Sequence, residues 1–206
     1  MTPRTLAVVS AGLGVPSSTR LLADRLAAAT SAAATGAGTD LDVRVIELRD
    51  LAHDVTNHLL TGFPPVALRR ALETLAAADA LIVATPIFNA SYSGLFKSFF
   101  DAVDHGTLAG KPVLIAATGG SARHSLALEH AVRPLFAYLR AVVVPTAVYA
   151  SAEDWGAAGG DGAGALGARI DRAAGELARE VARREAATVA GPFTLTTSFE
   201  RLLAGG

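Results

Sequence analysis

The stretch ALIVATPIFNASYSGLFKSFFD, residues 80–101, constrains the fold more than any other part of the chain. It begins with a short apolar run, Ala80–Ala84, which is typical of a buried strand. A ten-residue loop is predicted over Thr85–Gly94, and Leu95–Val103 then places apolar residues at helical spacing. Ligands of open α/β sheets bind beyond the carboxyl ends of the strands, and this loop is longer than a connection needs. The segment is therefore either a long connector or a binding loop.

Apolar strands and amphipathic helices alternate along the rest of the chain. The other strands are predicted at Leu6–Ser10, Asp42–Leu48, Lys111–Thr118 and, split by Pro145, at Val142–Val144 and Ala147–Ala150. The other helices are predicted from Ser18, over Val66–Ala78, over Ser125–Arg140 with a kink or restart at Pro134, and around Ile170–Val181. This alternation predicts a parallel sheet with helices on both faces. Five strands favour the three-layer flavodoxin-like sandwich with strand order 2-1-3-4-5.

Two segments show no clear periodicity and are predicted as loops. One is His53–Pro65, and the other is Ser151–Gly167, which is rich in Gly and Ala. The second loop carries Trp155, for which a lid or an interface anchor is favoured over a redox role. We expect residues 1–190 to form one domain, with 191–206 as a C-terminal tail.

Composition and charge exclude several classes of function. The chain has no cysteine, so disulfides, thiolate catalysis and Cys-ligated metal sites are ruled out. A formal net charge of −1 argues against nucleic acid or an anionic membrane as the main partner. The five histidines lack metal-ligand spacing, so no metal site is expected. No signal peptide or membrane span is recognisable, which makes the cytoplasm the expected location.

The loop after Leu6–Ser10 is suited to a phosphate. Backbone N–H groups at the start of the following helix have no partner within the helix, and the helix dipole is positive there. Hydroxyl groups are available from Ser10, Ser17, Ser18 and Thr19. Taken alone, this loop is slightly better explained as an ordinary capped turn.

Two further loops are predicted at the same edge of the sheet. In the long loop, the backbone amides of Phe88–Ser91 can meet the edge of a planar heterocycle, and Pro86 and Phe88 can contact its ring faces. In the loop Thr118–Ser121, two glycines let the backbone approach a ligand closely, and its N–H groups can stabilise negative charge.

The segment TPIFNASYSGLFKSFFD resembles the signature of the NADPH-dependent FMN reductase family, P-x-[YF]-N-x-S-x-x-[GA]-x-[LF]-K-x-x-x-D. The matching residues are Pro86, Phe88, Asn89, Ser91, Gly94, Lys97 and Asp101. The first loop, and Thr118-Gly119-Gly120, resemble the phosphate loop and the third flavin loop of that family. The likeness spans residues 4–150, and it departs from the family pattern at Pro16 and Ser93.

The resemblance implies a bound FMN and hydride transfer from NAD(P)H to flavin N5, chemistry that the cofactor itself carries. No side chain is then expected to be catalytic. The implied FMN phosphate contacts are Ser10, Ser17, Ser18 and Thr19. The implied isoalloxazine contacts are Pro86, Ile87, Phe88, Asn89, Ala90 and Ser91, with Thr118, Gly119 and Gly120 at the pyrimidine edge.

The resemblance also implies a homodimer or higher homo-oligomer. The stretch from SAEDWG onward resembles a subgroup that supplies reduced flavin to flavin-dependent monooxygenases. Two alternatives stay open: a quinone or azo reductase with tightly bound FMN, and a non-enzymatic flavin-binding electron carrier. The choice between NADH and NADPH is also open, with Arg20 and Arg123 as candidate contacts for a 2′-phosphate.

Overall fold

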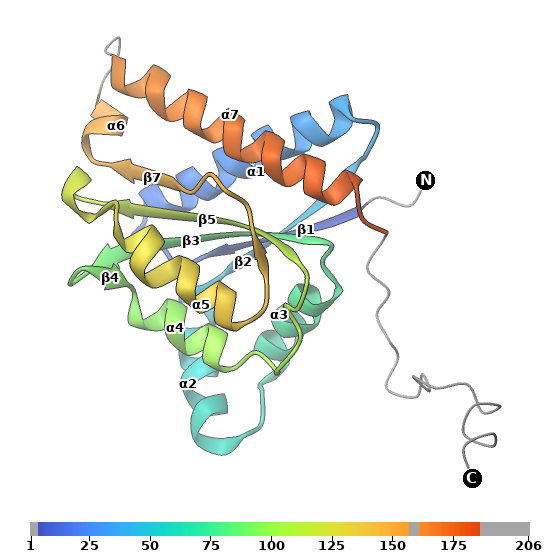
Figure 1. Ribbon diagram of the computed structural model, residues 1–206. Helices are drawn as coiled ribbons and strands as arrows, with labels where there is room; N and C mark the ends of the chain where they lie inside the picture. Colours follow the sequence, from blue (N-terminus) through green and yellow to red (C-terminus); the bar gives the residue numbers. More distant parts are fainter. Residues whose placement is uncertain (1–3, 157–160, 186–206) are drawn as a thin grey trace, which may run out of the picture.

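A sheet of seven strands lies at the centre of the structure, a computed structural model that describes residues 4–156 and 161–185 (Figure 1). The strands are β1 Arg4–Ser10, β2 Leu41–Glu47, β3 Ala80–Phe88, β4 Ser91–Tyr92, β5 Pro112–Gly119, β6 Val142–Val143 and β7 Val148–Ser151. They pair in the order β2-β1-β3-β5-β6, with β4 added to β3 and β7 added to β5. Every pair is parallel except the β3–β4 hairpin.

The flavodoxin-like fold class is confirmed, but the predicted number of five strands is wrong. The last predicted strand is interrupted at Pro145, and its two halves, β6 and β7, pair separately with β5. A proline cannot donate to a strand ladder, which explains the break. The other additional strand, β4, lies inside the segment predicted as a loop. With β6 and β7 sharing one position, the parallel strands follow the predicted order.

Helices cover both faces of the sheet (Figure 1). Helices α1 Ser18–Gly36 and α7 Asp161–Ala182 lie on one face, and α2 Ala52–Thr61, α3 Val66–Ala77, α4 Gly94–Asp101 and α5 Arg133–Tyr138 on the other. The alternation of β1 explains both cores, because Leu6 and Val8 pack with α1 and α7 while Ala7 and Val9 pack on the opposite face. None of the helices in the described parts of the chain could span a membrane.

The predictions of loops over His53–Pro65 and Ser151–Gly167 are wrong in part. His53–Pro65 contains most of α2, which the sequence pattern misses because only Val55 of this short helix is buried. Ser151–Gly167 contains the short helix α6, Glu153–Gly156, and the start of α7. Leu166 lies four residues before Ile170 and is fully buried, so it extends the apolar stripe of α7. The proposed tail, 191–206, lies outside the described residues.

The helix predicted over Ser125–Arg140 is interrupted, as expected from Pro134. A π-helical turn, Leu128–Val132, precedes α5, and Pro134 stands in the first turn of α5. That position suits proline because the first N–H groups of a helix have no intrahelical acceptor.

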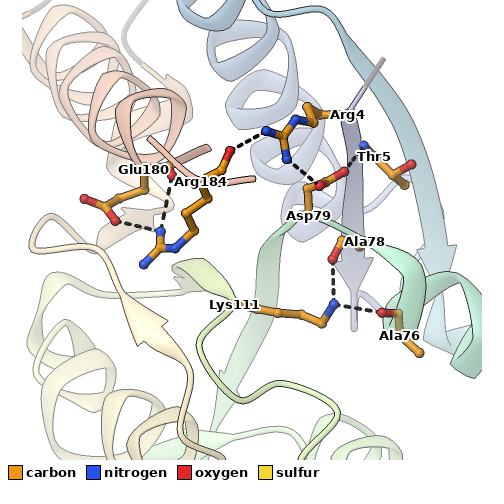
Figure 2. Close-up of polar contacts among 8 residues, drawn as sticks. All are labelled: Arg4, Thr5, Ala76, Ala78, Asp79, Lys111, Glu180 and Arg184. Carbon is orange, nitrogen blue, oxygen red and sulfur yellow. Dashed lines mark hydrogen bonds and ion pairs between the residues drawn. The ribbon is translucent and has the colours of Figure 1, made fainter. Parts of the chain in front are cut away.

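The amino edge of the sheet is closed by polar contacts (Figure 2). Arg4 donates to Asp79 at 2.9 Å and also to the backbone carbonyl of Arg184, just beyond α7. Lys111 donates to two carbonyls at the end of α3, both at 2.7 Å. Burial lowers the pKa of Lys111, and the charge of Asp79 opposes that change. These contacts tie α3 and α7 to the sheet at the edge opposite the carboxyl ends of the strands.

Candidate cofactor site

A cavity of about 940 Å³ opens at the carboxyl edge of the sheet. Its volume falls in the range of sites that hold cofactors and small ligands. Nine of the predicted site residues line it: Ser17, Ser18, Thr19, Pro86, Ile87, Phe88, Thr118, Gly119 and Gly120. The other lining residues are Leu13, Gly14, Pro16, Leu21, Arg25, Ala152 and Trp155. The structure thus brings the three loops singled out in the sequence to one cavity.

The first loop is built closely around the start of α1. Ser17 is the N-cap, and its hydroxyl accepts a hydrogen bond from the Arg20 backbone N–H at 3.2 Å. Gly12 approaches so closely that a Cβ atom placed there would lie 2.0 Å from Ser17 Oγ. Only glycine fits this position without displacing the cap. The remaining N–H groups of the first helical turn stay free for a ligand.

Ser10 lies at the carboxyl end of β1 and does not line the cavity directly. Its hydroxyl is fully buried and has no hydrogen-bond partner among the described residues. An unpaired buried hydroxyl costs about 1–3 kcal/mol. Among the residues that the structure describes, this hydroxyl therefore remains an unsatisfied polar group.

A hydrogen bond joins the first loop to the end of β5. The hydroxyls of Thr19 and Thr118 lie 2.7 Å apart, and both side chains are buried. Because one residue begins α1 and the other ends β5, this contact sets the distance between two walls of the cavity. The sequence separates the two residues by 99 positions and offers no sign of the pairing.

The prediction of a loop over Thr85–Gly94 is wrong, because most of this segment belongs to the hairpin of β3 and β4. Strand β3 runs on to Phe88 because Thr85 and Pro86 continue the parallel register with β5, and the next two residues pair with β4. Asn89 and Ala90 then form a two-residue turn with φ values of 46° and 67°. Positive φ at both turn residues is typical of a tight hairpin, although it is strained for alanine.

The hairpin divides its residues between the cavity and the solvent. Pro86, Ile87 and Phe88 line the cavity, with Phe88 48% exposed. Asn89, Ala90 and Ser91 are not among the lining residues, since they form the turn and the start of β4.

The third loop, Thr118–Ser121, packs against Tyr149, a residue for which the sequence predicts no role. A Cβ atom at Gly119 would lie 2.1 Å from Tyr149 Oη, so the backbone packs directly on the phenol. The phenol donates a hydrogen bond to the Ser121 carbonyl at 2.7 Å. Burial, aided by the charge of Asp154, raises the pKa of Tyr149 and keeps the donor protonated.

Arg25 and Trp155 form a fourth wall of the cavity. The sequence favours a lid or an interface anchor for Trp155 and gives no role to Arg25. Arg25 lies on the same face of α1 as Ser18 and Leu21, and its guanidinium carbon lies 5.0 Å from the centroid of the Trp155 ring. Trp155 belongs to α6, which follows β7 at the carboxyl edge. The spacing 18, 21, 25 is the one available signal, because it repeats at helical period.

Asp154 holds α6 in place. Its carboxylate accepts hydrogen bonds from the Ser151 backbone N–H, the Ser151 hydroxyl and Arg169 of α7, each at 2.8 Å. Burial alone would raise the pKa of Asp154, but the hydrogen bonds from Ser151 and the contact with Arg169 outweigh it and lower the pKa.

Asp154→Asn is expected to destabilise the protein by about 1 kcal/mol at neutral pH. The amide is uncharged and has one acceptor oxygen, so it cannot replace the carboxylate in all of these hydrogen bonds. A carboxyl group whose pKa is lowered on folding stabilises the folded protein at pH values above its unfolded pKa, about 3.9 for Asp. This stabilisation is lost as the pH falls through the pKa of the group in the folded protein. The difference in free energy of unfolding between parent and variant, measured with urea, should therefore reach its whole value at pH 7 and disappear below about pH 4. Asp171→Asn, at an exposed position of α7, is the control and should show no such difference. An equal difference at both pH values would contradict this account.

A parallel sheet of flavodoxin-like order, with a cavity across three strand ends, defines the class of flavodoxin-like cofactor-binding proteins. A solved oxidoreductase from Corynebacterium diphtheriae superposes with a TM-score of 0.86 at 49% identity, covering 90% of this chain and 100% of that one.

The particular family follows from sequence comparison. The pattern of the NADPH-dependent FMN reductase family matches residues 4–156. An FMN reductase (NADPH) of Pseudomonas aeruginosa is 40% identical over 153 residues, 74% of this chain and 80% of its own. The NADH-dependent FMN reductase SfnF of Pseudomonas putida is 40% identical over 146 residues, 71% of this chain and 76% of its own. The chain belongs to the NADPH-dependent FMN reductase family, a family of oxidoreductases that use FMN and NAD(P)H.

Proposed function

We propose that the cavity at the carboxyl edge binds FMN and that the protein reduces the flavin with NAD(P)H. One observation carries the proposal: three loops far apart in the sequence, each suited to a different part of FMN, line a single cavity. The family to which the chain belongs supports the same activity.

The residues present fit FMN at both ends of the cavity. At one end, the first turn of α1 and the hydroxyls of Ser17, Ser18 and Thr19 would hold the phosphate. The hydroxyl of Ser10 lies at the same end of the sheet and has no polar partner among the described residues, and a phosphate would supply one. At the other end, Gly119 and Gly120 would bring backbone N–H groups to the pyrimidine edge.

The hairpin would hold the ring system between these ends. Pro86 to Phe88 supply an apolar wall, and Asn89, Ala90 and Ser91 would reach the ring edge only through the backbone of the turn. When bound, FMN supplies the redox chemistry by accepting hydride from the nicotinamide. The protein itself would bind, orient and exclude water, and the N–H groups of the third loop would favour negative charge on the pyrimidine edge.

The finer features of the function are also proposals. The stretch from Ser151 onward resembles that of enzymes that supply reduced flavin to a monooxygenase, and we propose the same role here. We further propose one FMN-binding domain over residues 1–190, a homodimer and a cytoplasmic location. Exposed apolar side chains such as Leu60 and Phe63, 81% and 80% exposed, are compatible with contacts between subunits.

The test is a steady-state assay of the purified protein with NADH or NADPH against FMN, FAD and a quinone. We expect oxidation of the nicotinamide nucleotide that depends on added FMN. Nicotinamide absorbance that stays constant with FMN present would refute the proposal. Turnover with a quinone but not with free FMN would instead assign the protein as a quinone reductase with resident FMN.

A further inference from the structure

The cavity contains a cation that the proposed contacts with FMN do not use. Arg25 lines the cavity, and its guanidinium is held over the ring of Trp155. Among the described residues, no carboxylate forms an ion pair with Arg25. An arginine that faces a cavity without a counter-ion is suited to an anionic ligand, because its planar fork of donors matches phosphate oxygens.

The two arginines that the sequence suggested as phosphate contacts are less suited to this role. Arg20 donates to Asp24 at 2.7 Å and also pairs with Glu47, and the hydrogen bonds to these carboxylates raise its pKa. Two carboxylates thus already neutralise Arg20, which does not line the cavity. Arg123 stands in the exposed turn Ala122–His124, also outside the lining.

Arg25 is separated from the proposed FMN phosphate site along α1. Ser18 and Arg25 are seven positions apart, and at 1.5 Å per residue their backbones are about 10 Å apart along the helix axis. The cavity therefore presents two positions for anions, the start of α1 and the Arg25–Trp155 pair. FMN carries a single phosphate group, whereas a nicotinamide dinucleotide carries a pyrophosphate and, in NADPH, a 2′-phosphate.

Trp155 gives the arginine a defined place. A guanidinium over an indole face is attracted by the ring and loses part of its rotamer freedom. The indole is placed by α6, which Asp154 anchors to Ser151 and Arg169. The cation is therefore presented at the cavity wall before any ligand arrives, which reduces the ordering cost of binding.

We propose that Arg25, held on Trp155, binds a phosphate group of the nicotinamide nucleotide. The inference rests on the proposed function, since it assigns the second substrate of the same site. The ligand chemistry is a nucleotide phosphate, either the pyrophosphate shared by NADH and NADPH or the 2′-phosphate of NADPH alone.

The test compares Arg25→Ala and Arg25→Glu with the parent protein, with Arg123→Ala as the matched control outside the cavity. We expect the KM for the nicotinamide nucleotide to rise about tenfold in Arg25→Ala and further in Arg25→Glu, as charge is first removed and then reversed. The Kd of FMN, from quenching of its fluorescence, should stay within about twofold, and Arg123→Ala should behave as the parent. A rise for both nucleotides identifies the pyrophosphate, and a rise for NADPH alone identifies the 2′-phosphate.

Two results would overturn the inference. An unchanged KM for NADH and for NADPH in both Arg25→Ala and Arg25→Glu would show that Arg25 binds neither nucleotide. A main effect on the Kd of FMN would assign Arg25 to the flavin phosphate instead. A parent protein that oxidises no nicotinamide nucleotide with FMN present would be a failure of the proposed function, recognisable before any variant is measured.

Discussion

Gly12→Ala is expected to weaken FMN binding by about 100-fold, which corresponds to about 3 kcal/mol. The added Cβ would lie 2.0 Å from Ser17 Oγ and 3.0 Å from Ser17 Cβ, so the N-cap serine has to move. Its displacement removes a helix cap, worth about 1 kcal/mol, and misplaces hydroxyl and N–H donors to a phosphate, worth about 1.5–3 kcal/mol for a bond to a charged group. Titration of FMN fluorescence against the protein measures the change.

The control for this substitution is Gly36, the last residue of α1. Gly36 has no atom within 4 Å of an added Cβ, and Gly36→Ala should leave the FMN affinity at the parent value. Because Gly12→Ala also disturbs a cap, circular dichroism must show that both variants are folded at the temperature of the titration. A folded Gly12→Ala protein with parental affinity would remove the phosphate assignment from the first loop.

Gly119→Ala is expected to weaken FMN binding by about 30-fold, or about 2 kcal/mol. The new Cβ would lie 2.1 Å from Tyr149 Oη, and this phenol is buried and bonded to the Ser121 carbonyl. The phenol cannot withdraw without losing that bond, so the third loop shifts away from its position at the cavity wall. Equilibrium titration of FMN and the KM for FMN should report the same loss.

Two further variants separate the close approach to Tyr149 from a general effect of alanine in the loop. Gly120→Ala adds a Cβ with no atom within 4 Å, and we expect near-parental affinity because its backbone is retained. In Gly119→Ala combined with Tyr149→Phe the clashing oxygen is absent and the nearest ring atom of residue 149, Cζ, lies 3.2 Å away, so part of the affinity should return. Equal losses in Gly119→Ala and Gly120→Ala would contradict the role assigned to Tyr149.

Much of the fold follows from local patterns in the chain. The apolar runs that become β1, β3 and β5 predict buried parallel strands, and Pro134 predicts the restart seen at α5. Segments with a weak local signal were predicted wrongly. Helix α2 buries a single side chain, Val55, so its apolar stripe is too short to recognise. Residues 85–88 were predicted as a loop, although β5 pairs with the first two of them and β4 with the last two.

The candidate site likewise contains residues that local sequence patterns indicate and residues that they do not. The motif from Pro86 to Asp101, the serines of the first loop and the glycines at 119 and 120 each form a short local pattern. Their resemblance to the family pattern is what implies contacts with a phosphate and a planar heterocycle. Tyr149, Arg25 and Trp155 carry no such motif. They matter because of what they touch, and those contacts join segments 28 to 130 positions apart, as the pairs Tyr149–Ser121 and Arg25–Trp155 show.

The sequence by itself predicted the family, the strand order and the three loops that line the cavity, because these predictions depend on residue types at short spacing. Only the tertiary structure decided that Arg20 is neutralised by Asp24 and Glu47, while Arg25 lines the cavity with no carboxylate paired to it in the part of the chain that the structure describes. It also turned the long loop into a hairpin whose tip leaves the cavity lining. The physical reason is that counter-ions, packing neighbours and strand partners are supplied by distant segments, whose positions are set by the burial of the sheet as a whole.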